Sequence, residues 1–235
     1  MGKENKKELT IVIPALNEET LIGITVEETL AAADELLDNY EILLVNDGSS
    51  DSTADIMEEK ASGRSEIQVI HHTTPLGLGK VFNEGLNRAT YNNLVVLTGD
   101  HEISYDTLKK LFRAVGASEL ILGYRNNKMQ ARLFHRYLLS HIFNISMVIT
   151  TGYKILDFHG IPIYPVSCVR GLADLRLVGC TYQVEVVTRL LRKKTDYLQI
   201  PFSMNKEAYG SSQMLRFKTF VDILNMVSCL VFCKK

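Results

Sequence analysis

Four short apolar segments, each followed by a turn and then a helical pattern, constrain the fold of this chain most strongly. The segments are Leu9 to Ile13, Glu41 to Val45, Ile67 to Ile70 and Leu94 to Leu97. Their length and their β-branched residues are typical of buried strands. Strands that alternate with helices form parallel sheets covered by helices. The pattern therefore predicts an α/β domain with a mostly parallel, helix-covered sheet.

The second half of the chain departs from this regular alternation. The segment Gln130 to Thr150 is rich in Leu, Ile, Phe and Met, yet it also carries Arg and His. Because charged residues are costly inside a bilayer, we expect an amphipathic helix that packs on the sheet or lies in a membrane interface, packing being the commoner arrangement. Further elements are expected at Tyr105 to Ala114, Glu119 to Gly123, Thr181 to Lys194 and Tyr197 to Phe202.

Length and charge narrow the class of protein. A chain of 235 residues without an evident linker suits one large domain. The formal net charge of −1 argues against a nucleic-acid partner.

The polar N-terminal residues and the lack of a long uninterrupted apolar run predict a cytoplasmic location. Residues 214–235 mix apolar and charged side chains and end in two lysines, which predicts an amphipathic helix on a membrane surface.

Acidic residues follow the fourth apolar segment directly. Asp100 and Glu102 come after Thr98 and Gly99, at the point where the strand is expected to end. Ligands of open α/β sheets bind at the carboxyl ends of the strands, and carboxylate oxygens suit Mg²⁺ or Mn²⁺. A metal site at Asp100 and Glu102 is therefore one interpretation. The other is that these acids only cap the next helix.

Several motifs in order resemble those of family 2 glycosyltransferases, and most of all the dolichol-phosphate (polyprenol-phosphate) mannose synthases. In the first half they are Ile11 to Glu19, Val45 to Asp51, and Leu76-Gly77-Leu78-Gly79. In the second half they are Gly179, Tyr182 to Glu185, Ile200-Pro201 and Tyr209 to Ser212. The resemblance thus covers nearly the whole chain.

The resemblance implies a GT-A fold, with a nucleotide-sugar half (1–123), an acceptor half (124–213) and the amphipathic segment 214–235. It also implies inverting transfer of a sugar from a GDP- or UDP-sugar to a polyprenyl (dolichyl) phosphate, by a protein that touches the membrane peripherally. The residues that match the family's nucleoside site are Pro14, Leu16, Glu18, Val45 and Asp47. A carboxylate such as that of Asp47 can accept hydrogen bonds from a base edge or from ribose, although a turn-forming role is the alternative.

The family's metal signature is only partly present. Asp100 matches its second aspartate and Glu102 its later oxygen ligand, whereas Thr98 replaces its first aspartate. That first aspartate usually lies beside the sugar and ribose of the donor, so Thr98 and Gly99 are candidate donor contacts. The substitution bears on the identity of the donor and on the strength of metal binding.

Positive charges that the family uses are also fewer here. Arg125 matches a family arginine near the donor diphosphate, whereas Glu207 and Gln213 occupy an arginine and a lysine position. A diphosphate and a lipid phosphate together need cationic partners. The candidates are Lys80, Arg125, Lys206 and, at low pH, His159; Glu185 is a candidate on the acceptor side.

Three hypotheses follow. The first is a metal-dependent glycosyltransferase that acts on a polyprenyl phosphate, with Asp100, Arg125 and Glu185 as candidate catalytic residues. The second is the same fold acting on a cell-surface polysaccharide or another acceptor. The third is a catalytically silent paralogue that binds a nucleotide or a partner, which the residues Thr98, Glu207 and Gln213 motivate.

Overall fold

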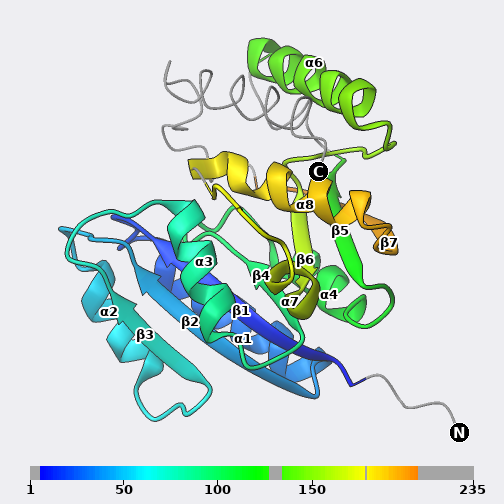
Figure 1. The fold of residues 1–235 in the computed structure, drawn as a ribbon. Coiled ribbons are helices and arrows are strands. Elements are labelled where there is room, and N and C mark those ends of the chain that lie inside the picture. The colour runs from blue at the N-terminus through cyan, green and yellow to red at the C-terminus, as the bar shows by residue number, and fades with distance from the viewer. Residues whose placement is uncertain (1–5, 127–133, 178, 206–235) are drawn as a thin grey trace, which may run out of the picture.

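The computed structural model describes residues 6–126, 134–177 and 179–205, and its centre is a seven-stranded sheet of order β3-β2-β1-β4-β6-β5-β7 (Figure 1). The strands are β1 Glu8–Ala15, β2 Asn39–Asn46, β3 Ile67–His71, β4 Asn93–Val96, β5 Leu120–Arg125, β6 Ile161–Pro165 and β7 Tyr197–Phe202. All of them run parallel except β6. The predicted helix-covered α/β architecture is confirmed.

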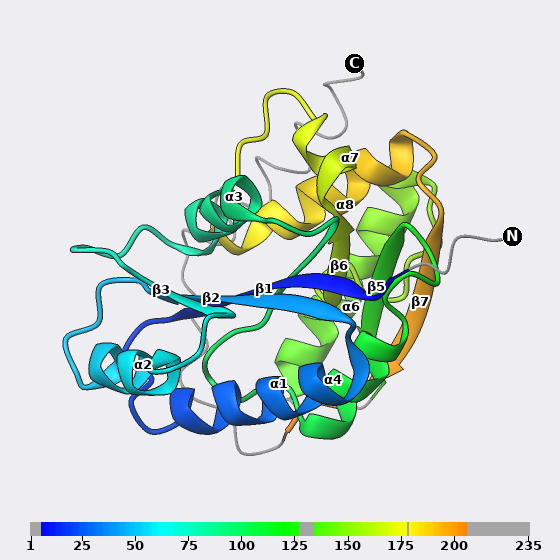
Figure 2. The ribbon, with the colours of Figure 1, turned by 90° about the horizontal axis from the view of Figure 1, so that it is seen from below.

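Helices cover both faces of the sheet. They are α1 Ile22–Leu36, α2 Thr53–Ala61, α3 Leu78–Arg88, α4 Tyr105–Arg113, α6 Phe134–Thr151, α7 Val166–Arg170 and α8 Tyr182–Arg192. Figure 2 shows α1, α2 and α4 on one face and α3, α7 and α8 on the other. Helix α6 lies on the outer side of α8 (Figure 1).

Side chains of β1 alternate between the two faces, as a strand buried on both sides requires. Ile11 and Ile13 belong to the core under α1 and α4, whereas Val12 belongs to the core under α3 and α8. Gly85 of α3 lies against this strand so closely that an added Cβ would be 2.5 Å from a methyl group of Val12. The glycine lets α3 pack directly on the sheet.

Strand β6 is the strand of the sheet that the sequence patterns did not predict. It lies antiparallel between β4 and β5, and Ile163 pairs with Val95 on one side and with Ile121 on the other. Its two prolines disfavour an interior strand, which explains the miss. Because β6 runs opposite to its neighbours, its first residues lie at the edge where β4 and β5 end.

No helix in the described part of the chain is long and apolar enough to span a bilayer. The expected amphipathic segment 214–235 lies outside the described residues, as do Lys206, Glu207 and Gln213.

Candidate active site at the carboxyl edge of the sheet

The carboxyl ends of three neighbouring strands meet at one edge. Strand β1 pairs with β2 on one side, where Ala15 lies beside Asn46, and with β4 on the other. The ends of these strands and the loops that follow them carry most of the predicted donor residues. The parallel register therefore brings together segments that are far apart in sequence, at the usual ligand position of such sheets.

Asp100 is held in place by its own loop. Its Oδ1 atom accepts a hydrogen bond from the Thr98 hydroxyl at 2.7 Å and one from the Glu102 backbone N–H at 3.3 Å. Both bonds fall on one oxygen, and Oδ2 accepts none from the residues that the structure describes. Thr98 therefore orients Asp100 rather than adding a second carboxylate.

Gly99 brings this loop close to β1. Its N–H donates to the Pro14 carbonyl at 2.9 Å, and its own carbonyl accepts from the Thr25 hydroxyl at 3.2 Å. A Cβ at this position would lie 2.8 Å from the Cβ of Ala15. Only glycine allows this close approach without moving neighbouring atoms. Gly99 and Pro14 contact each other through their backbone atoms.

Glu18 faces further negative charge. Partial burial raises the pKa of the Glu18 carboxyl, and the nearby carboxylates of Asp100 and Asp51 raise it further. Like charges disfavour ionisation of each other. The loops after β1 and β4 thus create a negative region that attracts a cation.

A divalent ion fits part of this site. Among the described side chains no three His, Cys, Asp or Glu converge in an arrangement that holds a metal by itself. Mg²⁺ typically takes only one or two carboxylates and completes its shell with water and substrate phosphates. Asp100, with an oxygen to spare beside Glu18, suits this kind of site, in which the substrate supplies further ligands.

His101 does not continue an extended strand. Its φ angle of 52° places it in the left-handed region, so the chain turns sharply after Asp100. Its Nε2 lies 3.0 Å from Oε2 of Glu28 on α1. The His101 side chain is therefore engaged by α1.

Asp47 is engaged by the loop that leads into α3. Its Oδ1 accepts the N–H of Leu76 at 2.8 Å, and its Oδ2 accepts the N–H of Gly77 at 2.9 Å. His72 Nδ1 lies 2.8 Å from the same Oδ1. The backbone N–H groups at the start of the glycine motif before α3 thus bind the Asp47 carboxylate.

The remaining predicted donor residues differ in exposure. Leu16 is partly exposed and Lys80 on α3 is exposed, with no ion pair to any described residue. Val45, in contrast, is fully buried in the core beneath α3 and α8. Its side chain packs in that core, and its predicted place at the nucleoside site stays a prediction.

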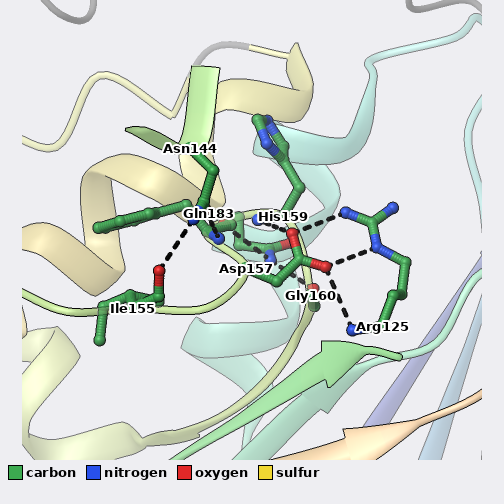
Figure 3. A network of polar contacts seen from close by, with 8 residues as sticks. Arg125, Asn144, Ile155, Asp157, His159, Gly160 and Gln183 are labelled. Atoms are coloured by element: carbon green, nitrogen blue, oxygen red, sulfur yellow. Dashed lines mark hydrogen bonds and ion pairs between the residues drawn. The ribbon is translucent and has the colours of Figure 1, made fainter. Parts of the chain in front are cut away.

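Arg125 is a buried ion-pair residue. Its Nε donates to Asp157 Oδ2 at 2.7 Å and its Nη2 to Oδ1 at 2.9 Å, and both side chains are at most 5% exposed. Figure 3 shows the two groups facing each other. The pair joins the end of β5 to the loop before β6. Contact between Arg125 and a diphosphate stays a prediction.

The loop at Asp157 is also tied to α6 and α8 (Figure 3). Asn144 of α6 accepts the N–H of Phe158 at 3.1 Å and donates to the Ile155 carbonyl at 3.0 Å. Gln183 of α8 donates to the Gly160 carbonyl. His159 belongs to this loop, and its ring lies 4.7 Å from that of Phe143. The network fixes the acceptor half against the sheet edge.

Glu185 of α8 anchors the loop that precedes this helix. The residue is 6% exposed, and its carboxylate accepts hydrogen bonds from the N–H groups of Arg176 and Leu177. Arg189, one turn later on α8, donates to it at 2.8 Å. The described contacts give Glu185 a structural task, and its predicted role in transfer stays a prediction.

Comparison with known proteins agrees with this architecture. The family model described as glycosyl transferase family 2 matches residues 10–169. The chain is 30% identical, over 99% of its length and 70% of the relative's, to the undecaprenyl-phosphate 4-deoxy-4-formamido-L-arabinose transferase of Photorhabdus laumondii. It is 27% identical to the undecaprenyl-phosphate mannosyltransferase of Micrococcus luteus, over 86% of each chain.

A solved structure shows the same fold. Glucosyl-3-phosphoglycerate synthase from Mycobacterium tuberculosis, crystallised with Mg²⁺ and uridine diphosphate, superposes with a TM-score of 0.67 at 12% identity. The match covers 95% of this chain and 79% of that one. The family model, the relatives and the sheet together make this chain a member of glycosyl transferase family 2 with a GT-A fold.

Proposed function

We propose that this glycosyltransferase moves a sugar from a nucleotide diphosphate donor to a polyprenyl phosphate. The observation that carries the proposal is the placement of Asp47 and Asp100 on either side of β1, at one edge of the sheet. The names of the two relatives, both undecaprenyl-phosphate transferases, support the class of acceptor.

The donor's nucleoside would lie over the loops after β1 and β2. Leu16 is partly exposed there, and the carbonyl of Pro14 fixes the neighbouring loop. His72, Leu76 and Gly77 of the loop that leads into α3 engage the Asp47 carboxylate, which leaves one of its roughly four acceptor positions for a base N–H or a ribose hydroxyl. Whether the base is guanine or uracil is decided by binding, as tested below.

Asp100 would hold Mg²⁺ or Mn²⁺, with Glu102 as a second oxygen ligand. Such an ion, when bound, neutralises charge on the departing diphosphate. Thr98 keeps Asp100 oriented through its hydroxyl. Glu18, whose pKa is raised by burial and by Asp100, adds negative charge that favours the cation.

The transfer itself needs little proton chemistry from the protein. An oxygen of the acceptor phosphate forms the new bond to the anomeric carbon while the bond from that carbon to the diphosphate breaks, which inverts the centre. A phosphate monoester has a second pKa of about 6, so the acceptor is already ionised at neutral pH. A strong general base is therefore unnecessary.

Cationic side chains would offset the phosphates. Lys80 is exposed on α3 and is a candidate for the donor side. The buried Arg125 pairs with Asp157, so we assign it first to positioning the loop that begins β6. Glu185 has the corresponding task for the loop before α8.

Contact with the membrane would be made by the outer face of α6. Ile142, Ile145 and Ile149 are 55%, 47% and 78% exposed, whereas Met147 on the opposite face is fully buried. An apolar face of this kind on a helix fits the interface of a bilayer. Lys154 and Lys194, both exposed near the end of α6, suit anionic headgroups.

Vesicle sedimentation tests this surface. Ile145→Glu combined with Ile149→Glu should reduce co-sedimentation with vesicles of phosphatidylcholine and phosphatidylglycerol. Ile24→Glu is the matched control, because Ile24 is 43% exposed on α1, on the other face of the sheet. Equal sedimentation of the α6 variant and the control would remove the membrane role of this helix.

A transfer assay tests the reaction. Wild type is incubated with undecaprenyl phosphate, Mn²⁺ and a panel of UDP- and GDP-sugars, and lipid products are detected by mass spectrometry. A glycosylated lipid phosphate, lost in Asp100→Asn, is the expected result. Nucleotide binding without lipid product but with transfer to a polysaccharide would favour the second hypothesis. Binding without any transfer would favour a silent paralogue.

A further inference from the structure

His72 lies between two carboxylates at the carboxyl edge of the sheet. It follows β3 directly, and its side chain is 10% exposed. Its Nδ1 is 2.8 Å from Asp47 Oδ1 at the end of β2, and its Nε2 is 2.8 Å from Glu84 Oε2 on α3. Both ring nitrogens therefore face acceptors.

This geometry favours the protonated ring. A neutral imidazole carries one N–H, so one of its nitrogens would direct a lone pair at a carboxylate, whereas the imidazolium donates from both. Burial disfavours the charge on His72, but the hydrogen bonds and charges of Asp47 and Glu84 outweigh it and raise the pKa above its usual value. Among the described residues, Arg88 makes the only other ion pair with these two carboxylates, and it lies 3.1 Å from Glu84.

The contact reaches the loop between β3 and α3. Asp47 receives His72 at one end of this loop and the N–H groups of Leu76 and Gly77 at the other. Gly77 has a φ of 85°, a conformation that suits glycine, and it is the N-cap residue immediately before α3. One carboxylate thus closes the whole loop, and His72 fixes the rotation of that carboxylate.

We propose that His72 is a positioning residue for the nucleotide donor, which as an imidazolium clamps the Asp47 carboxylate and the loop of residues 72–77 in the shape that receives the nucleoside. The inference rests on the proposed donor role of Asp47. Because the group that holds Asp47 is a cation in this proposal, donor binding should weaken when the His72 ring loses its proton. A ring that only filled space would leave binding independent of its protonation.

The neighbouring His71 provides a matched control. It also lies beside a carboxylate, with Nε2 2.8 Å from Glu58, but its side chain is 42% exposed and does not touch Asp47. His71→Gln and His72→Gln make the same chemical change one residue apart. His72→Arg retains a cation with several donors and serves as the conservative variant.

The test is calorimetry of UDP and GDP binding with Mn²⁺ across the pH range in which histidine titrates. Wild type and His71→Gln should bind more weakly as pH rises. His72→Gln should bind about tenfold more weakly at neutral pH, because hydrogen bonds to charged groups are lost, and should be flat across this range. His72→Arg should recover most of the affinity and also be flat.

The outcomes separate two failures. Wild-type affinity in His72→Gln, or the same pH profile in it as in wild type, would overturn the positioning role alone. If no nucleoside diphosphate binds to wild type, the proposed donor function fails and the positioning role fails with it. Should His72→Gln not fold by circular dichroism, the pH profile of wild type against His72→Arg decides: identical profiles would overturn the proposal.

Discussion

Arg125 and Asp157 form a bidentate ion pair in the interior, with guanidinium-to-carboxylate distances of 2.7 and 2.9 Å. The pair fastens the start of the unexpected strand β6 to the end of β5. A buried charge that loses its partner is costly, because it keeps its desolvation without compensation. This relationship makes Arg125 first of all a determinant of the architecture of the acceptor half.

Replacement of this arginine should therefore destabilise the protein strongly. Arg125→Met is expected to lower the free energy of unfolding by about 3–5 kcal/mol in urea denaturation. Arg113→Met is the control: Arg113 is 55% exposed and lies 3.5 Å from Glu35, and such surface pairs contribute about 0–1 kcal/mol. Equal losses in the two variants would show that the pair does not stabilise the fold.

The hydroxyl of Thr98 should matter for metal-dependent binding. Thr98→Val keeps the shape but removes the hydrogen bond to Asp100, so nucleotide affinity in Mn²⁺ should fall about fivefold to tenfold. Thr98→Ser retains the hydroxyl and should bind like wild type. Calorimetry with and without Mn²⁺ measures both, and an unaffected valine variant would contradict the orienting role.

Gly99 should tolerate no side chain. The added methyl of Gly99→Ala would meet Ala15 at 2.8 Å and Ile22 at 3.1 Å, which should cost about 1–3 kcal/mol of stability and weaken nucleotide binding. Gly23 of α1 is the control, since a Cβ there makes ordinary contacts of 3.6 and 3.7 Å. Gly23→Ala should be neutral or stabilising by up to about 1 kcal/mol. A harmless Gly99→Ala would contradict the close approach to β1.

The charge on Glu18 should destabilise the free protein. Its folded pKa lies above the ordinary value of 4.5, so the folded state binds more protons in that window and stability falls as pH rises through it. Glu18→Gln should thus be more stable than wild type at neutral pH, by less than about 1 kcal/mol because the group is partly solvated. The gain should vanish in acid.

Thermal unfolding across pH measures this gain, and Glu59→Gln on the exposed part of α2 controls for the loss of one charge. Added Mn²⁺ should reduce the difference between Glu18→Gln and wild type, because a bound cation relieves the repulsion. A variant less stable than wild type at neutral pH would contradict the proposed negative region.

The sequence predicts the parallel part of the sheet well, because its strands are short, mostly apolar segments set off by turn residues. Ile13, for example, is fully buried in β1, and Asp100 follows β4 as expected. Strand β6 escapes prediction because Pro162 and Pro165 resemble strand breakers, and its burial depends on neighbours distant in sequence.

The location of the site residues in the fold could be predicted from the sequence, but their contacts could be predicted only in part. Asp47 and Asp100 follow strands that end at one edge, so their proximity follows from topology alone. The partners of Arg125 and Asp47 cannot be deduced from topology, because Asp157 lies 32 residues from Arg125 and His72 lies 25 residues from Asp47. A histidine directly after β3 was the available sign of the clamp, but histidines at strand ends have no fixed role.

The central claim is that Asp100 and its surroundings bind a nucleoside diphosphate together with a divalent ion. Calorimetry of UDP and GDP with Mn²⁺ or with a chelator, on wild type, Asp100→Asn and the exposed control Asp106→Asn, tests it most directly. The account predicts binding of one nucleotide that depends on Mn²⁺, is lost in Asp100→Asn and is kept in Asp106→Asn. Absence of binding in wild type, or equal binding in both variants with and without Mn²⁺, would contradict it.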